Sequence, residues 1–165
     1  MALQYHVAGR SAYFAYSMPV AGNILHHAIE MLLKSLLLEK GYTATQLKDN
    51  FRHNLRRLWK ETKKVAGNPG LTAYDQVIVR IAAMEELRYP RRGYTFQMSL
   101  RKEPPSPATG PAAAGLRHYH VSLEEVDELM KILLTNNVTP DWVRTRLSRG
   151  DAINQYLREN LHSFI

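Results

Sequence analysis

The segment from Pro19 to Lys40 constrains the fold more than any other part of the chain. Pro19 suits the first turn of a helix, Ser17 is available as its cap, and Gly41 suits the left-handed position that ends one. The segment therefore predicts a helix of about six turns. Apolar side chains cover most of its circumference, and a helix of that kind is buried on nearly every side. We expect the rest of the chain to pack around this helix.

The polar residues of the segment fall on one side of the expected helix. Asn23, His27, Glu30 and Lys34 lie within about 60° of one another, with His26 beside them. In one interpretation this stripe is the solvent-exposed side of the helix, stabilised by an ion pair between Glu30 and Lys34, which are four residues apart. In the other, the stripe is the floor of a cleft.

Composition narrows the class of protein. A chain of 165 residues with 45% hydrophobic residues is expected to form a single domain over 1–165. The absence of cysteine excludes disulfides, thiol nucleophiles and cysteine-zinc sites. Neither a signal peptide nor a membrane span is predicted, because the most apolar segment carries ionisable residues at 26, 27, 30 and 34. We expect a cytoplasmic protein, whose net charge of +7 permits an anionic partner.

Helical patterns recur along the chain. Residues 3–16 suggest a short helix or an extended arm, and Thr43 or Thr45 can cap a short turn. Apolar residues at helical spacing predict a helix over about 51–66 that stops at Gly67, and another from about residue 72 to residue 89, before Pro90. Further patterns predict a helix to about residue 135, with Ser122 and Glu125 in capping-box spacing, and helical structure from residue 139 onward. The predicted fold is all-α, an up-and-down bundle of about five helices.

Two segments do not follow the helical pattern. Residues 94–100 alternate between apolar and polar, which predicts an extended segment. No partner strand is apparent, so we expect an arm lying on the helices or pairing with a second copy. The Pro- and Ala-rich residues at about 101–117 predict a long mobile loop.

A dense basic stretch runs from residue 48 to residue 64, where seven Lys or Arg and two acidic residues leave a charge of +5. On one helix Arg52, Arg56, Lys60 and Lys63 would form a continuous basic ridge, with Arg57 beside it. An arginine side chain can bind two phosphate oxygens at once, so the ridge suits RNA or a nucleotide. The alternative is that the ridge is a solvated helix face.

Histidines are the other candidates for chemistry. His53 lies among cationic neighbours, which favour the neutral form that a general base needs, although the same pattern fits a histidine that caps the helix. The pairs His26–His27 and His118–His120 lack the spacing of a compact ligand set, so no metal site is predicted. No Gly-rich phosphate loop or other cofactor motif is present, and no cofactor is expected.

Three motifs taken in order resemble the HEPN family (higher eukaryotes and prokaryotes nucleotide-binding). They are Ala28-x-Glu30-x-x-x-Lys34-x-Leu36-Leu37, His53-Asn54-Leu55-x-x-Leu58 and Arg88-Tyr89-Pro90. The resemblance covers residues 19–90. It implies a helical up-and-down bundle, dimeric in most members, that cleaves or binds RNA or binds nucleotides, often in a toxin-antitoxin or defence system beside a nucleotidyltransferase partner.

Two departures from the family pattern bear on function. Arg52 stands where glycine is common before the histidine. The ribonuclease members carry an arginine and a histidine separated by four to six residues; here the nearest pair, Arg158 and His162, has three residues between. Our leading hypothesis is therefore a binding module for RNA or nucleotide phosphate. The alternatives are a metal-independent ribonuclease with His53 as base, and an interaction module that docks an acidic protein.

A homodimer is also expected. A helix that is apolar on so many sides needs more cover than two or three neighbours in a small bundle supply, and large uncovered apolar patches are rare on soluble monomers. A second copy related by two-fold symmetry would provide that cover, with residues 94–100 reaching across.

Overall fold

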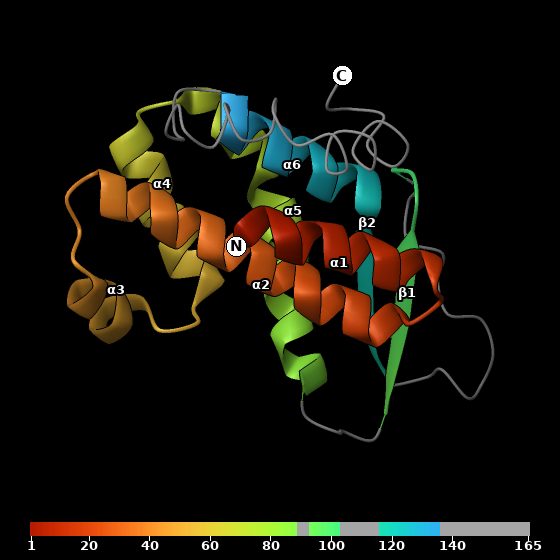
Figure 1. The fold of residues 1–165 in the computed structure, drawn as a ribbon. Coiled ribbons are helices and arrows are strands. Elements are labelled where there is room, and N and C mark those ends of the chain that lie inside the picture. Colours follow the sequence, from red (N-terminus) through yellow and green to blue (C-terminus); the bar gives the residue numbers. More distant parts are fainter. Residues whose placement is uncertain (89–92, 103–115, 136–165) are drawn as a thin grey trace.

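The computed structural model describes residues 1–88, 93–102 and 116–135 and is mostly helical (Figure 1). Two short 3₁₀ helices interrupt the α-helical segments, and one small sheet joins two parallel strands. The elements in chain order are α1 (Ala2–Phe14), α2 (Met18–Glu39), α3 (Ala44–Phe51), α4 (Leu55–Ala66), η1 (Pro69–Tyr74), α5 (Asp75–Ala83), η2 (Met84–Arg88), β1 (Tyr94–Ser99), β2 (Arg117–Ser122) and α6 (Leu123–Thr135).

The central helix is confirmed as α2, with Pro19 in its first turn and Gly41, at φ 91°, just beyond its end. The Ser17 side chain makes no capping hydrogen bond, so the sequence predicted the position of the start but not how it is capped. Helix α1 lies along α2 (Figure 1). Their approach is so close that a Cβ on Gly9 would come within 2.8 Å of two side-chain carbons of Leu25, and glycine is therefore required at this crossing.

The chain itself covers α2. Helix α2 is packed against helices α1, α4 and α5, the η2 segment and strand β1. The buried apolar residues of α2, from Ala21 to Leu37, are each at most 3% exposed. Val20 and Leu38 are the large apolar residues of α2 that remain exposed. The reason given above for expecting a dimer is therefore wrong, because one copy supplies the cover; the dimer itself stays a prediction.

The helix predicted over 51–66 is wrong in its first turn. Helix α3 ends at Phe51, a turn follows, and α4 begins at Leu55 with Asn54 as its cap. Of the two candidate caps, Thr43 and Thr45, it is Thr43 that caps α3, through a capping box with Gln46. Gly67 ends α4 in the left-handed conformation, as predicted. The break falls where it does because the Asn54 side chain accepts the amide of Arg57 in the first turn of α4, which places Arg52 and His53 outside any helix.

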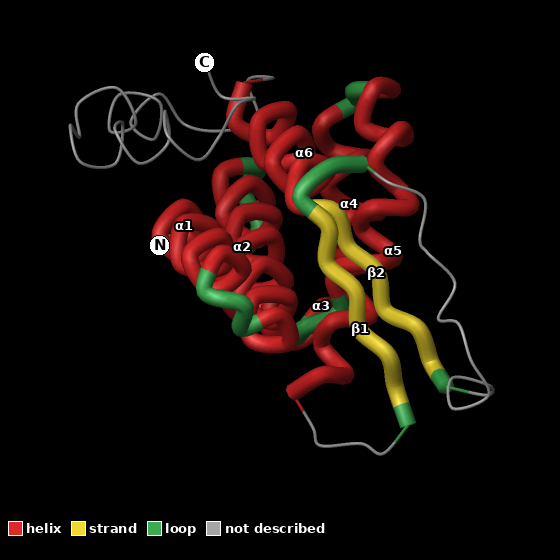
Figure 2. The backbone as a smooth tube through the Cα atoms, turned by 90° about the vertical axis from the view of Figure 1, so that its right-hand side faces the viewer, coloured by secondary structure: helices red, strands yellow, loops and turns green. Residues whose placement is uncertain are grey.

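The expectation of a lone extended segment is also wrong. Strand β1 pairs in parallel with β2, with Tyr94 opposite Arg117 and Ser99 opposite Ser122 (Figure 2). The partner strand carries two histidines at alternating positions, and its polar composition concealed its burial from Tyr119 to Ser122. The fold is mostly helical, consistent with the predicted all-α class, and it carries one small two-stranded sheet in the described residues. Ser122 accepts the amide of Glu125 at 3.4 Å, as expected for the start of α6.

Other predictions fall partly or wholly outside the described residues. The helix predicted from residue 72 to residue 89 is present to Arg88, but both of its ends are 3₁₀ segments. The region 103–115 of the predicted loop, the Tyr89-Pro90 part of the third motif, and the helical pattern after residue 139, including Arg158 and His162, are not described.

Candidate functional site

The turn between α3 and α4 displays His53. The amide of Asn54 donates to the carbonyl of Phe51 at 2.8 Å, and Arg52 has φ 47° and ψ −112°. These angles are those of the first central residue of a type II′ turn, a position that favours glycine. The backbone at Arg52 is therefore strained, and strain of this kind is concentrated at functional sites.

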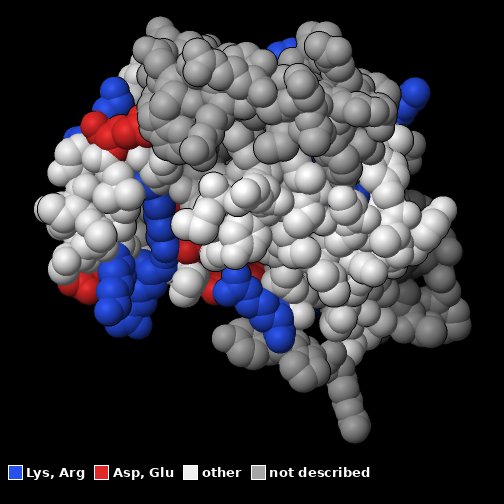
Figure 3. Space-filling model, in the orientation of Figure 1, with Lys and Arg blue, Asp and Glu red and all other residues white. Residues whose placement is uncertain are grey.

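The first turn of α4 brings cations to the positive end of a helix. Asn54 Oδ1 accepts the amide of Arg57 at 3.0 Å, and Arg56 and Arg57 lie in that first turn. A helix N-terminus carries partial positive charge, so cations there are destabilised unless an anion is nearby. Arg52, Arg56 and Arg57 are all exposed, and none has an ion-pair or hydrogen-bond partner within the described part of the chain. Lys and Arg side chains gather over the α3 region in Figure 3.

The carboxylate of Glu30, on α2, contacts and orients the side chain of His53. The Nδ1 atom of His53 lies 3.0 Å from Oε1 and 3.3 Å from Oε2 of Glu30, and Lys34 Nζ donates to Oε1 at 2.6 Å. Glu30 is 1% exposed, whereas the His53 side chain is 57% exposed. A buried carboxylate thus holds an exposed imidazole, and the contact joins two segments 23 residues apart.

Two further histidines surround the same carboxylate. His26 Nδ1 donates to the carbonyl of Ile81 at 3.0 Å, and its Nε2 lies 3.7 Å from Glu30 Oε2, beyond hydrogen-bond distance. His27 Nδ1 lies 3.9 Å from the same oxygen, and the His27 ring meets the ring of Tyr5 edge-on. The polar stripe of α2 therefore converges on Glu30, except for Asn23, whose amide donates to the Pro19 carbonyl one turn earlier.

The charge of Glu30 is strongly stabilised. Burial raises the pKa of this carboxyl, but His26, Lys34 and His53 together outweigh burial and lower the pKa to about 2. Burial, and then the positive charge of Arg88, lower the pKa of His27 against the opposing influence of Glu30. Glu30 is thus an anion under all ordinary conditions, and it can hold His53 by a charge-assisted hydrogen bond.

An open pocket of about 900 Å³ lies beside this group. One side comes from residues 49–57, which include His53 and the three arginines, and the other from Ala82, Ala83, Glu85 and Glu86. Glu30 does not line the pocket. The predicted ion pair between Glu30 and Lys34 is confirmed, but Glu30 is itself buried and supports the pocket through His53 without lining it.

The basic ridge is shorter than the sequence predicted. Because Arg52 precedes α4, it cannot continue a helical face with Arg56 and Lys60, although all three are exposed. The amine of Lys63 donates to both oxygens of Asp75, at 2.6 and 2.8 Å, and lies over the ring of Trp59. Lys63 therefore stabilises the packing of α4 against α5. The positive charge in the pocket comes from the arginines, beside the acids Asp49, Glu85 and Glu86 in the same lining.

The remaining histidines do not form a metal site in the part of the chain that the structure describes. Thr95 and His118 are hydrogen-bonded across the strands at 2.8 Å, and no group of three or more potential ligands gathers among these residues. Within residues 1–88, 93–102 and 116–135, no helix is long and apolar enough to cross a membrane.

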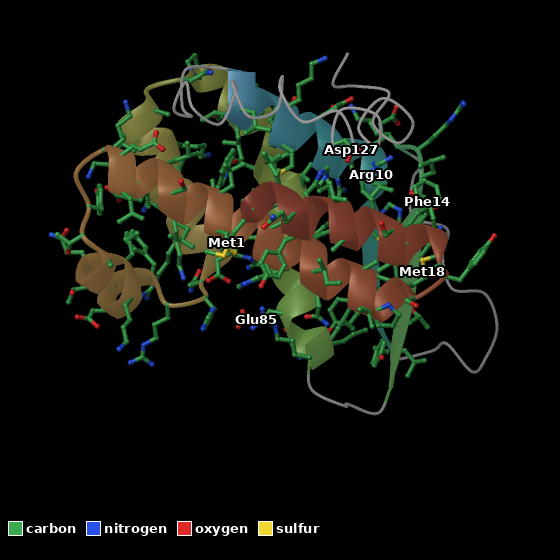
Figure 4. The ribbon with its side chains drawn as sticks, viewed as in Figure 1. Met1, Arg10, Phe14, Met18, Glu85 and Asp127 are labelled. Carbon is green, nitrogen blue, oxygen red and sulfur yellow. The ribbon has the colours of Figure 1, made fainter. Side chains whose placement is uncertain are left out.

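Sequence reasoning missed a second charged cluster. Asp127 of α6 receives hydrogen bonds from His6 Nε2, at 2.9 Å, and from a terminal guanidinium nitrogen of Arg10, both on α1. All three are at most 4% exposed, and Figure 4 shows Arg10 and Asp127 between α1 and α6. The spacing of His6 and Arg10 by four residues was the available signal, but nothing in the sequence indicated a partner 117 or 121 residues away.

Comparisons with protein-family models, with curated proteins and with solved structures gave no match.

Proposed function

We propose that this chain is a HEPN-like module that binds RNA or nucleotide phosphate in the pocket between the α3–α4 turn and the end of α5. The observation that carries the proposal is the set of exposed arginines at 52, 56 and 57, which line that pocket near the N-terminus of α4 and have no partner among the described residues. Three cations held near the positive end of a helix favour an anionic ligand. Arginine and backbone amides are the usual ligands of phosphate oxygens.

The meeting of two motif segments also supports the proposal. Glu30 and Lys34 come from the first segment that resembles the family, His53 comes from the second, and the three side chains are joined through the Glu30 carboxylate. The up-and-down bundle and a toxin-antitoxin or defence role with a nucleotidyltransferase partner belong to the same proposal and rest on the resemblance. The proposed cytoplasmic location rests on composition, above all on the absence of cysteine.

Salt dependence tests phosphate binding. Affinity for a single-stranded RNA oligonucleotide should fall steeply between low and moderate salt, with a slope of about −0.7 per phosphate contact in a plot of log K against log salt. The Arg56→Ala variant should weaken binding and reduce that slope by about one contact. Lys64→Ala is the matched control, because Lys64 lies outside the pocket and pairs with Glu61. Binding that does not depend on salt, or no binding, would overturn the proposal.

A second candidate is a metal-independent ribonuclease, and the Glu30–His53 contact favours it. A carboxylate that accepts the Nδ1 proton fixes the tautomer and leaves Nε2 with a free lone pair to act as a base. Arg52 and Arg56 lie on the same pocket and would stabilise the negative phosphorane. Purified protein incubated with labelled RNA and a chelator decides this: cleavage that His53→Ala abolishes supports the enzyme, and intact RNA excludes it.

Self-association is a further part of the proposal. The resemblance implies a homodimer, and exposed apolar residues lie at the end of α1 and the beginning of α2, at Phe14, Tyr16 and Val20. Sedimentation at micromolar concentration separates a dimer from the 18.9 kDa single chain.

An acidic protein is the alternative occupant of the arginine-lined pocket, and competition between such a protein and RNA would distinguish the two.

A further inference from the structure

The pocket carries an unpaired acid as well as unpaired arginines. Glu85 of η2 lines it and is half-buried, and no described residue forms an ion pair or hydrogen bond with its carboxylate. The adjacent Glu86 differs, because its Oε2 accepts hydrogen bonds from Tyr119, at 2.8 Å, and from Arg117 of β2. In Figure 4, Glu85 lies well away from the Arg10–Asp127 cluster. Glu85 is therefore a carboxylate with open acceptor positions on a concave surface.

Opposite charges share this pocket without pairing. Glu85 comes from the segment after α5, and Arg52, Arg56 and Arg57 come from the α3–α4 segment, yet no ion pair joins them. An unpaired half-buried carboxylate is costly unless water or a ligand satisfies it. A complementary ligand has an anionic group at one end and hydrogen-bond donors at the other.

Apolar residues also line the pocket. Ala82 and Ala83 precede Glu85 and belong to this lining, as does Phe51. Aromatic rings and small apolar side chains accept the flat face of a nucleobase, and unstacked bases bind proteins in this way. The pocket, at about 900 Å³, has room for a nucleotide.

We infer that the pocket selects guanine, with Glu85 reading the edge of the base while the arginines hold its phosphate. This inference rests on the proposed function. A carboxylate only accepts hydrogen bonds. Guanine presents two adjacent donors, N1–H and N2–H, to such an acceptor, whereas adenine and cytosine present one donor beside an acceptor and uracil presents one donor between two acceptors. Glu85 thus forms two hydrogen bonds with guanine and one with any other base.

Calorimetric titration with GMP, AMP, CMP and UMP tests the selection. GMP should bind about tenfold more tightly than the other three, the discrimination typical of one bidentate base contact. The Glu85→Gln variant should lose that preference, because an amide replaces one acceptor with a donor, and should bind AMP at least as well as GMP. Glu39→Gln is the control, since Glu39 is an exposed acid at the end of α2 that does not line the pocket.

Two further arms identify the source of the guanine. Guanosine and inorganic phosphate, each alone, should bind more weakly than GMP, because each occupies one end of the pocket. Comparison of the hexamers UUUUUU and UUGUUU shows whether a guanine within a strand is also selected.

The outcomes separate the inference from the proposed function. Equal affinity for GMP and AMP, unchanged by Glu85→Gln, would overturn guanine selection and leave phosphate binding intact. Absence of binding by every nucleotide and both hexamers would overturn both. Thermal unfolding of each variant shows that it is folded.

Discussion

The molecule contains two carboxylates that have similar partners but differ in how far those partners are exposed to solvent. Glu30 meets His53 and Lys34, and Asp127 meets His6 and Arg10. The side chains of His53 and Lys34 are 57% and 26% exposed, whereas those of His6 and Arg10 are 0% and 2% exposed. An acid, a histidine and a cation therefore occur together twice, once open to solvent and once sealed inside the protein.

The difference in exposure separates structural from functional roles. The Asp127 cluster connects α1 to α6, and no ligand can reach it without moving a helix, so it acts by holding the two helices together. The Glu30 cluster exposes part of an imidazole at a pocket, where the buried carboxylate orients the ring. A charged cluster of this kind is a candidate for chemistry only where one member reaches solvent.

The largest expected effect concerns Asp127. Asp127→Asn leaves the guanidinium of Arg10 buried without a counter-charge, and breaking a buried ion pair in this way costs about 3 to 5 kcal/mol of unfolding free energy. Urea denaturation measures the loss. Glu128→Gln is the control, because Glu128 pairs with Lys102 at the surface and such pairs contribute less than about 1 kcal/mol. Equal stability of the two variants would mean that the sealed cluster does not hold α1 to α6.

The next effect is a pH dependence that originates at Glu30. The pKa of this carboxyl is about 2 in the folded chain, below its ordinary value of 4.5, so its stabilising contribution is complete above pH 4.5 and is lost as the pH falls toward 2. That shift corresponds to roughly 3 kcal/mol.

Denaturation curves measured from pH 6 to pH 2 test this contribution. The stability of Glu30→Gln should be lower near neutral pH and should fall less steeply below pH 4.5 than that of the unsubstituted chain. Parallel pH curves for the two proteins would show that Glu30 is not the titrating group.

The same comparison explains what could be predicted from the sequence. The α2 stripe was visible because helical periodicity places Glu30, Lys34 and the two histidines on one face, which is a local property. The resemblance placed Glu30 and His53 in successive motifs, but the contact between them was not predicted. The Asp127 cluster was not predictable, because pairing across more than 100 residues depends on tertiary packing and leaves no periodic signal.

The errors at α3–α4 and at β2 have local causes. The apolar residues at 51, 55 and 58 keep helical spacing across the break, so periodicity hid the turn; the sequence signal for it was Asn54, a strong cap residue. At β2 the side chains of His120 and Ser122 are buried despite their polarity, and strand prediction depends on apolar alternation. Both errors arise where polar residues have a structural role, as a helix cap or as buried side chains, that apolar periodicity does not reveal.

Replacing one histidine from each cluster sharpens the comparison at a smaller scale. His6→Ala removes a fully buried side chain and its hydrogen bond to Asp127, so we expect a loss of about 2 kcal/mol in unfolding free energy. His53→Ala should cost less than about 1 kcal/mol, because the ring is largely exposed. RNA binding or cleavage should change in the opposite order, with His53→Ala the more damaging. Denaturation and binding assays on both variants check that the order of the two variants is reversed between stability and RNA binding.

The smallest expected effect is a gain in stability at the open site. Two non-glycine residues in the described part of the chain have positive φ, Arg52 at 47° and Tyr16 at 57°. Glycine relieves strain at such positions, and after its larger loss of chain entropy we expect Arg52→Gly and Tyr16→Gly each to raise stability by about 1 kcal/mol.

Only one of these two substitutions should affect binding. Tyr16 is 86% exposed in the turn between α1 and α2 and does not line the pocket, so its replacement should leave RNA affinity unchanged. Arg52→Gly removes a pocket cation, and affinity should fall as stability rises. An arginine retained where the turn favours glycine implies that its side chain has a use which offsets the strain. If Arg52→Gly raised stability with no loss of affinity for RNA or nucleotides, the strain at Arg52 would have no connection with the pocket.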